Sequence, residues 1–391
     1  MKILMIGWEL PPHNSGGLGV ACLGLAKAIS KKGAKITFVL PKKVDVNYDF
    51  MDVVFADVKE IESFKTSYTS STRGIETMWL DEPMPPDFVK AALAYGEKMS
   101  EVAKKVDADI VHSHDWLTSP AAFSAKKTLK IPQVAHVHST EFDRTGGNYP
   151  NKYVYDIEKN GLQLADRIIS VSEYTKNLIV QKYGVGSKKI NVVHNGVDEF
   201  AKKDLPPVMV ELKKLGYKIV LYLGRITLQK GPDYFVYAAK RVLSFNPKTL
   251  FIVVGDGDMQ GFMMNEVARL GMMDNFLFTG FLRGDEKDRV WQNSDIYVIP
   301  SVSEPFGITA LESIANETPV IVSKQSGVSE VLNHVLKVDF WDIDEMTNKI
   351  VSVLKYPPLR KDLTLESKKE LPTVNWDTAA DKCMRVYSQL R

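Results

Sequence analysis

The feature that most constrains the fold is an alternation of short apolar runs with longer amphipathic segments. Residues 2–7 form a short, continuous apolar run, as expected of a strand that is buried on both faces of a sheet, and residues 35–40 are a second predicted strand. Between them, apolar residues recur at helical spacing from Leu18 to Ile29, and Gly33 follows as a helix terminator. Regular alternation of strand and helix predicts an α/β fold with helices on both sides of a parallel sheet.

The alternation is interrupted once and then starts again, which predicts two domains. Asn195-Gly196 opens a turn-rich, lysine- and proline-containing segment that ends near Pro207 and is the best linker candidate. We expect two Rossmann-like, doubly wound domains facing a central cleft, at residues 1–195 and 196–375, with the last helix (376–391) packing back on the first. Strand-like runs lie at residues 109–112, 133–138, 167–171 and 189–193 before the linker, and at 218–223, 250–254, 276–279, 295–299 and 319–322 after it.

Composition narrows the function classes. The net charge of +2 over 391 residues gives no strong field, so a nucleic-acid partner is not expected. The two cysteines, Cys22 and Cys383, lie in apolar helical patterns without a CxxC pair, and no apolar run is long enough for a signal peptide core or a membrane span. We therefore expect a cytoplasmic protein.

Positive charge is nevertheless uneven in the first half. Solvated helix faces are the favoured interpretation, while a membrane surface or an anionic acceptor remains an alternative. The clustered lysines are Lys27, Lys31, Lys32, Lys35, Lys42 and Lys43, and then Lys126, Lys127 and Lys130.

The segment 301–312, Ser-Val-Ser-Glu-Pro-Phe-Gly-Ile-Thr-Ala-Leu-Glu, carries the strongest chemical signal. It follows a predicted strand, so Glu304 lies on a loop at the strand's carboxyl end and Glu312 one or two turns into a helix. Amide groups and the dipole at the start of that helix suit a diphosphate, and carboxylates accept hydrogen bonds from sugar and ribose hydroxyls. A nucleotide sugar fits both features. A helix cap and an exposed helix charge are the alternative.

A second segment agrees with this interpretation. Gly224-Arg225 ends the first strand of the second half, and Gln229-Lys230-Gly231 follows within a short loop. Two cations at the end of a strand can stabilise the charge that develops on a leaving diphosphate. Two surface cations in a turn are the alternative.

The glycine-rich loop at residues 11–19 argues against a nicotinamide cofactor. It lacks a G-x-G-x-x-G pattern, and the strand at residues 35–40 is followed by Pro41-Lys42 rather than by an acidic residue for a ribose. No cofactor is expected.

Closely spaced histidines occur at His112-Ser-His114-Asp115 and at His136-Val-His138. They could be metal ligands, but His136 and His138 share one strand face and no helical pair completes the set, so no metal is expected. Two Asp-x-Asp sequences, at residues 107–109 and 256–258, match the metal-diphosphate signature of another transferase fold, although a turn or helix cap is favoured for both.

Together, the Glu-x7-Glu spacing of Glu304 and Glu312, the Pro-Phe-Gly between them and the Gly-Arg…Lys-Gly loop resemble the GT-B retaining glycosyltransferases that include glycogen and starch synthases. The resemblance runs over nearly the whole chain. It implies that Glu304 contacts the donor sugar, that Glu312 contacts the ribose, and that Arg225 and Lys230 face the leaving diphosphate. The phosphates are then met by the backbone amides of Phe306, Gly307, Ile308 and Thr309.

The same resemblance assigns further positions. It implies that His138 lies against the donor sugar, that Asp115 lies near the acceptor, and that Gly255 belongs to a turn beside the nucleotide. Gly16 and Gly17 would lie near the phosphates and the acceptor. Ser15 stands where glycogen synthases often carry a lysine, so the donor is left open.

The implied reaction is transfer of a hexosyl group, glucosyl above all, from ADP-glucose or UDP-glucose to an acceptor hydroxyl, as in α-glucan elongation. Neither a metal nor another cofactor is implied. Two alternatives are a transferase that acts on a lipid-linked or surface glycan and a non-hydrolysing nucleotide-sugar epimerase. Membrane contact is not favoured.

Overall fold

The computed structural model describes residues 1–14, 16–59, 87–198 and 207–390. These residues form two compact units. The first unit comprises Met1–Gly196 together with Asn375–Arg391, and the second unit comprises Val197–Val374.

The first unit is built on a parallel seven-stranded sheet in the order β3-β2-β1-β4-β5-β6-β7. The strand order reverses between β1 and β4, and α/β proteins bind ligands at such a reversal. The sequence analysis did not predict β3, a four-residue edge strand with half-buried side chains. The strands are β1 (Lys2–Ile6), β2 (Lys35–Leu40), β3 (Asp52–Phe55), β4 (Ile110–His114), β5 (Gln133–Val137), β6 (Arg167–Ser170) and β7 (Ile190–Val192).

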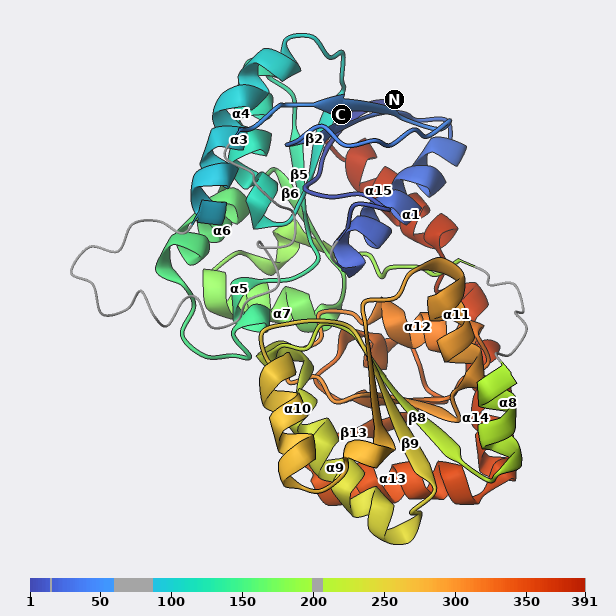
Figure 1. Ribbon diagram of the computed structural model, residues 1–391. Coiled ribbons are helices and arrows are strands. Elements are labelled where there is room, and N and C mark those ends of the chain that lie inside the picture. Colours follow the sequence, from blue (N-terminus) through green and yellow to red (C-terminus); the bar gives the residue numbers. More distant parts are fainter. Residues whose placement is uncertain (15, 60–86, 199–206, 391) are drawn as a thin grey trace, which may run out of the picture. The chain divides into compact units, whose positions relative to one another are not determined.

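Helices cover this sheet. The pair α3 and α4 packs an apolar cluster that includes Tyr95, Met99 and Ala122 (Figure 1). The last helix, α15, packs on α1, because Gly24 leaves room for the ring of Trp376: a Cβ at Gly24 would lie 2.4 Å from Trp376 Cε2. The helices are α1 (Gly17–Lys31), α3 (Asp87–Ala103), α4 (Ser119–Leu129), α5 (Glu141–Arg144), α6 (Lys152–Leu164), α7 (Glu173–Tyr183) and α15 (Trp376–Ser388).

The second unit repeats the plan with a parallel six-stranded sheet in the order β10-β9-β8-β11-β12-β13. The order again reverses, here between β8 and β11. The sequence analysis missed β13, a three-residue edge strand. The strands are β8 (Lys218–Leu223), β9 (Thr249–Val254), β10 (Phe276–Gly280), β11 (Ile296–Ile299), β12 (Val320–Ser323) and β13 (Leu336–Val338).

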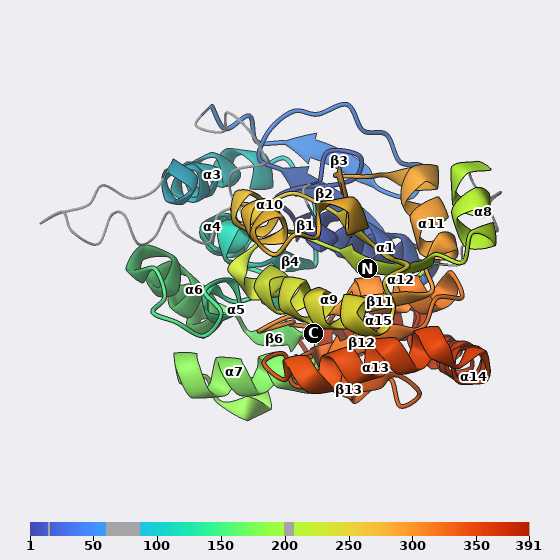
Figure 2. The same cartoon turned by 60° about the horizontal axis from the view of Figure 1, so that its bottom comes forward.

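Helices α9 and α13 lie side by side against this sheet (Figures 1 and 2). They share a buried cluster with Phe251 and Phe276. Helices α11 and α12 contact β8, β11 and β12. No helix in the described part of the chain is long and apolar enough to cross a membrane. The helices are α8 (Pro207–Lys214), α9 (Pro232–Phe245), α10 (Gln260–Arg269), α11 (Gly284–Asn293), α12 (Ile308–Ala315), α13 (Ile343–Lys355) and α14 (Pro357–Lys368).

Candidate functional site

The centre of the candidate site in the second unit is an ion pair between Lys230 and Glu304. Lys230 Nζ lies 2.5 Å from Glu304 Oε2, and the two side chains are 19% and 8% exposed. Lys230 ends the short 3₁₀ helix Leu228–Lys230 that follows β8, whereas Glu304 follows β11. Because β8 and β11 are neighbours, loops at their carboxyl ends meet although the two residues are 74 positions apart.

The Glu304 loop is held in place by the segment that follows β12. The Glu304 amide donates to the Gln325 carbonyl at 2.9 Å, and the Gly327 amide donates to the Glu304 carbonyl at 2.9 Å. Ser301 Oγ donates to Glu304 Oε2 at 3.1 Å. Glu304 is therefore held in position through both its backbone and its side chain.

Gly307 turns the chain from this loop into α12. Its φ of +106° is a conformation that favours glycine, and a Cβ there would lie 3.3 Å from Glu304 Cγ. Phe306 is buried, and its carbonyl accepts from the Val328 amide at 2.6 Å. The first-turn amides, at Ile308 and Thr309, have no acceptor within the helix, so they form the positive end of its dipole.

Gln229 links Arg225 to the Glu304 loop. Arg225 Nη2 donates to Gln229 Oε1 at 3.0 Å, and the Gln229 carbonyl accepts from the Val302 amide at 3.0 Å. Gln229 is buried, and the sequence analysis gave it no role. Both cations of the loop are thus tied to residues 301–304.

Gly255 allows the loops after β8 and β9 to touch. Its φ is +139°, and a Cβ there would lie only 1.9 Å from the Gly224 carbonyl oxygen. Its neighbour Asp256 accepts from the Gly257 amide at 2.7 Å, which is local turn geometry. The Asp-x-Asp of the first unit also makes local contacts: Asp107 pairs with the Lys2 side chain, and Asp109 accepts from the Lys2 amide at 2.8 Å.

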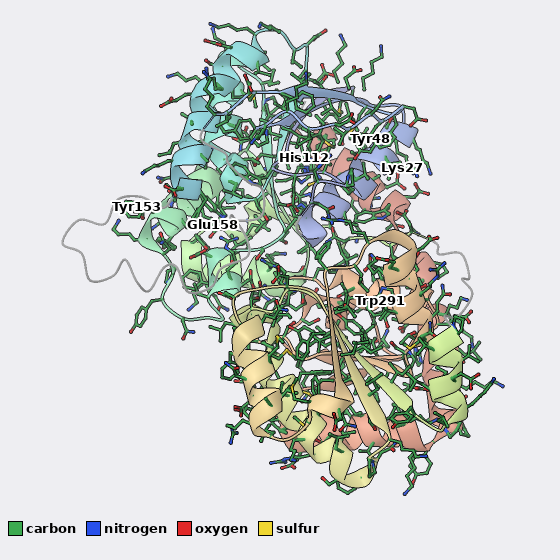
Figure 3. The ribbon with its side chains drawn as sticks, viewed as in Figure 1. Lys27, Tyr48, His112, Tyr153, Glu158 and Trp291 are labelled. Atoms are coloured by element: carbon green, nitrogen blue, oxygen red, sulfur yellow. The ribbon has the colours of Figure 1, made fainter. Side chains whose placement is uncertain are left out.

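Tyr297 joins β8 to α12. Its hydroxyl donates to the Leu223 carbonyl at 2.7 Å and lies 3.0 Å from Thr309 Oγ1. Burial raises the pKa of Tyr297 well above its usual value, so the hydroxyl keeps its proton. Trp291, labelled in Figure 3, packs edge-to-face on Tyr297 with ring centroids 4.5 Å apart. These contacts fix the start of α12.

Glu312 pairs with a lysine that the sequence analysis did not single out. Lys287 Nζ, from α11, lies 2.9 Å from Glu312 Oε1, and the side chains are 24% and 9% exposed. The nearest sequence signal is the charged face of α11, which does not reveal a partner 25 residues away. Each glutamate of the Glu-x7-Glu pattern therefore has its own lysine.

In the first unit, Asp115 and His138 lie together just after β4 and β5. Asp115 Oδ1 accepts from the His138 amide at 2.6 Å and from the Ser139 amide at 3.2 Å. Burial raises the pKa of Asp115 to about 7, although these two hydrogen bonds oppose the shift. Burial lowers the pKa of His138 to about 3, so its imidazole is neutral at pH 7.

The glycine-rich loop leads into the start of α1. A Cβ on Gly16 or Gly17 would meet no atom of the described residues within 4 Å. Glu9 Oε1 accepts from the Gly19 amide at 3.2 Å and holds the first turn of the helix. Ser15 lies outside the described residues.

The histidines gather more closely than their sequence spacing indicated. One ring nitrogen from each of His112, His114 and His136 lies within 4.8 Å of the other two, and Cys22, His114 and His138 form a second set of this kind. The expectation of no metal rested on the lack of a helical partner pair. In the structure, the pair His112 and His114 on β4 lies next to His136 on β5, so the neighbouring strand supplies the further histidine instead of a helix.

The structure thus brings Lys230, Glu304 and Gly307 together, connects Arg225 to them through Gln229, and places Gly255 beside the loop that carries Arg225. Asp115 and His138 form a separate group in the first unit.

Sequence comparisons agree with the division into two similar halves. Residues 15–199 match the family described as Glycosyltransferase Family 4, and residues 209–370 match Glycosyl transferases group 1. An uncharacterized glycosyltransferase of Methanocaldococcus jannaschii is 28% identical over 99% of this chain and 98% of its own. Glycogen synthase of Mycobacterium tuberculosis is 27% identical over 99% of this chain and 94% of its own.

A third relative is more similar over a shorter span. The UDP-Gal:alpha-D-GlcNAc-diphosphoundecaprenol alpha-1,3-galactosyltransferase of Escherichia coli is 30% identical over 65% of this chain and 68% of its own.

Solved structures show the same fold. Sucrose-phosphate synthase from Thermosynechococcus elongatus has a TM-score of 0.79 at 18% identity, covering 100% of this chain and 98% of that one. Anabaena HepE in complex with UDP and glucose has a TM-score of 0.75 at 16% identity, with both chains fully covered. The sequence matches and the two Rossmann-like sheets together establish that this chain belongs to the group 1 glycosyltransferases of GT-B fold and is a glycosyltransferase.

Proposed function

We propose that this chain is a retaining glucosyltransferase that uses ADP-glucose or UDP-glucose as donor and elongates an α-glucan. The Lys230–Glu304 ion pair beside the first turn of α12 carries the proposal. It joins a cation suited to a phosphate and a carboxylate suited to sugar hydroxyls. Both lie at the carboxyl edge of a parallel sheet, where α/β proteins bind their ligands.

In the proposed reaction, the bond between the anomeric carbon and the diphosphate oxygen breaks as the acceptor hydroxyl oxygen bonds to that carbon. Arg225, Lys230 and the first-turn amides of α12 stabilise the charge that develops on the leaving diphosphate. The hydroxyl proton passes to the departing phosphate oxygen, so the products are a glycoside and a nucleoside diphosphate. Glu304 holds the donor sugar and Glu312 the ribose.

We favour attack from the same face as the leaving group. Glu304 Oε2 is already engaged by Lys230 and Ser301, which suits hydrogen bonding to a sugar better than covalent attack on it. The resemblance to retaining enzymes supports the same choice.

The remaining assignments concern the surroundings of the reacting groups. We assign the neutral imidazole of His138 to the donor sugar, Asp115 to the acceptor, and the Gly255 turn to the nucleotide. The open space at Gly16 and Gly17 supports a close approach of phosphate or acceptor to the start of α1. Both cysteines are buried free thiols, which supports a reducing cytoplasmic setting.

The acceptor is proposed from the relatives. The Mycobacterium tuberculosis relative named glycogen synthase spans this chain almost completely, which supports an α-glucan acceptor.

A second candidate acceptor is a lipid-linked glycan, as in the name of the Escherichia coli relative. A specific observation favours it: an open hollow of about 490 Å³ beside α4 is lined by Phe123, Lys127 and Lys130, together with Lys126, which pairs with Asp166 of the same lining at 2.8 Å. An apolar ring among lysines suits an anionic lipid headgroup.

The first experiment measures thermal stabilisation of the full chain by ADP-, UDP- and GDP-glucose. Transfer from the best donor is then followed with glycogen or with a diphospho-lipid-linked sugar as acceptor. Stabilisation by one nucleotide sugar with elongation of glycogen supports the proposal, whereas transfer to the lipid alone supports the second candidate. Absence of stabilisation by every donor, or formation of an epimer without acceptor, would contradict the transferase site as proposed.

A further inference from the structure

Four of the chain's seven histidines lie on one face of the first sheet. His112 and His114 are two apart on β4, while His136 lies on β5 and His138 directly follows it. Side chains two apart on a strand point to the same face. Since His114 is paired in register with His136, the two rows of imidazoles lie next to each other.

The four rings are in mutual contact inside the first unit, where Figure 3 labels His112. Centroids of contacting rings are 4.2–5.5 Å apart. His112 Nε2 lies 3.2 Å from His136 Nδ1, and His114 Nδ1 lies 3.0 Å from His138 Nε2. The Tyr387 hydroxyl of α15 contacts His112 Nδ1. His112, His114 and His136 are at most 2% exposed.

Two of the ring nitrogens are left without a partner. Within the described part of the chain, His114 Nε2 and His136 Nε2 are buried and make no hydrogen bond. Buried polar atoms in native proteins almost always have a partner, so two such atoms in adjacent rings show that the cluster leaves hydrogen-bonding capacity unused.

The distances suit a small tetrahedral ion. Zinc binds imidazole nitrogens at about 2.0–2.1 Å, which places two of its ligand nitrogens roughly 3.3–3.4 Å apart. The 3.2 Å separation of His112 Nε2 and His136 Nδ1 is close to that edge length, so an ion could take the place of their single shared proton. One ring nitrogen of each of the three histidines lies within 4.8 Å of those of the other two.

The electrostatic setting agrees. The carboxylate of Glu9 is near enough to act on Cys22, next to the cluster, and would offset part of the charge of a divalent ion.

We propose that His112, His114 and His136 bind one zinc ion that fixes the ends of β4 and β5. The site goes beyond the proposed transferase function, because none of its three ligands is among the residues assigned to the donor or the acceptor. The other candidate set, Cys22, His114 and His138, would occupy the imidazole assigned to the donor. The three-histidine set leaves the imidazole of His138 available for its proposed contact with the donor sugar.

The test uses the tag-free full chain after chelation. Zinc is measured by elemental analysis after reloading and dialysis, and Co²⁺ is titrated as a probe because its visible absorption reports tetrahedral nitrogen ligation. We expect one ion per chain, a visible absorption spectrum of the Co²⁺ form that indicates tetrahedral nitrogen ligation, and a rise in melting temperature on adding zinc. The wild-type spectrum keeps the proposal testable if a histidine variant fails to fold.

His136→Asn removes one ligand and should weaken Co²⁺ binding about 100-fold or more, since even the loss of a residue that only orients a ligand costs about 10–100-fold. His334→Asn is the matched control, because His334 is 52% exposed and pairs with Glu370. Cys22→Ser and His138→Asn should also retain the ion. Wild-type chain that does not retain zinc, or loss of the ion in Cys22→Ser or His138→Asn but not in His136→Asn, would overturn the assignment.

Discussion

Each glutamate of the candidate donor site is neutralised by a lysine from a different element. Lys230 pairs with Glu304, and Lys287 pairs with Glu312. Both pairs are largely shielded from water, where electrostatic interactions are stronger than at an open surface. The proposed site therefore depends on cations that arrive from the loop after β8 and from α11.

Lys230→Ala is expected to lower kcat by about 100-fold, since a cation that stabilises the leaving diphosphate contributes about 3 kcal/mol to the transition state. Arg225→Ala should act similarly. The matched control is Lys324→Ala, which removes another ion-paired lysine of the second unit, 55% exposed and bound to Asp339. Steady-state kinetics with the best donor give the comparison. A double variant of Arg225 and Lys230 with wild-type turnover would exclude the proposed role.

Lys287→Ala should mainly raise KM for the donor, by about 5-fold, because a lost partner of a partly buried carboxylate costs on the order of 1 kcal/mol in ligand binding. The change is expected in KM because Glu312 is assigned to the ribose, remote from the reacting bond. Lys287→Arg should restore most of the affinity. A fall in kcat with unchanged KM would count against this assignment.

At the scale of elements, glycines set how closely the loops of the second unit approach. Gly255 lets the end of β9 touch the Gly224 carbonyl, and Gly307 gives α12 its sharp start. Neither position accepts a side chain without backbone movement, since both φ values are positive.

Gly255→Ala is expected to lower the free energy of unfolding by more than about 2 kcal/mol, because the Cβ would overlap the Gly224 carbonyl and the backbone would have to shift. Gly261→Ala is the matched control. Gly261 lies in α10 with nothing within 4 Å of its Cβ position, so alanine should be neutral or stabilising by up to about 1 kcal/mol. Chemical denaturation measures both. Equal effects of the two variants would show that the contact at Gly255 is unimportant.

The sequence predicted the strands that are buried on both faces, and the edge strands β7 and β10 as well, but it missed the edge strands β3 and β13. Runs such as β2 and β8 are mostly apolar, and their predicted bounds match the structure. By contrast, β3 and β13 have three or four residues and lie at sheet edges, so they leave no clear periodic pattern.

Site residues could be predicted from the sequence only where they follow a recognisable strand. Glu304 and Lys230 each stand after a recognisable strand, so their position at one sheet edge could be expected. Lys287 and Gln229 could not be assigned, because their partners are set by helix packing and loop pairing. The histidine cluster likewise depends on the register of β4 with β5, which no local pattern gives.

On the scale of the whole molecule, the chain contains buried carboxylates whose ionisation opposes folding. Glu158 on α6 is 3% exposed, and burial raises its pKa to about 7 although Arg144 opposes the shift. Its Oε2 accepts from the Glu141 amide at 3.0 Å. The folded chain therefore keeps a proton on Glu158 at a pH where the unfolded chain has lost it.

The protonated Glu158 carboxyl contributes fully to stability below about pH 4. As the pH rises from there toward 7, the free energy of unfolding falls by about 1.4 kcal/mol per pH unit. Glu158→Gln removes this dependence. The stability of the variant relative to the wild type should thus increase by roughly 3 kcal/mol between pH 4 and pH 7. Urea denaturation across this range measures it. Parallel pH profiles for the two proteins would mean that Glu158 is ionised in the folded state.

The pairing of Lys230 with Glu304 has one more consequence. A lysine side chain that is free to rotate loses up to about 2 kcal/mol of conformational entropy when a ligand immobilises it. Here the carboxylate already restrains the ammonium group while the protein folds. In the proposed reaction, the donor phosphate would replace the carboxylate as the partner of an ammonium group that is already restrained, so most of the ordering of the lysine would precede donor binding.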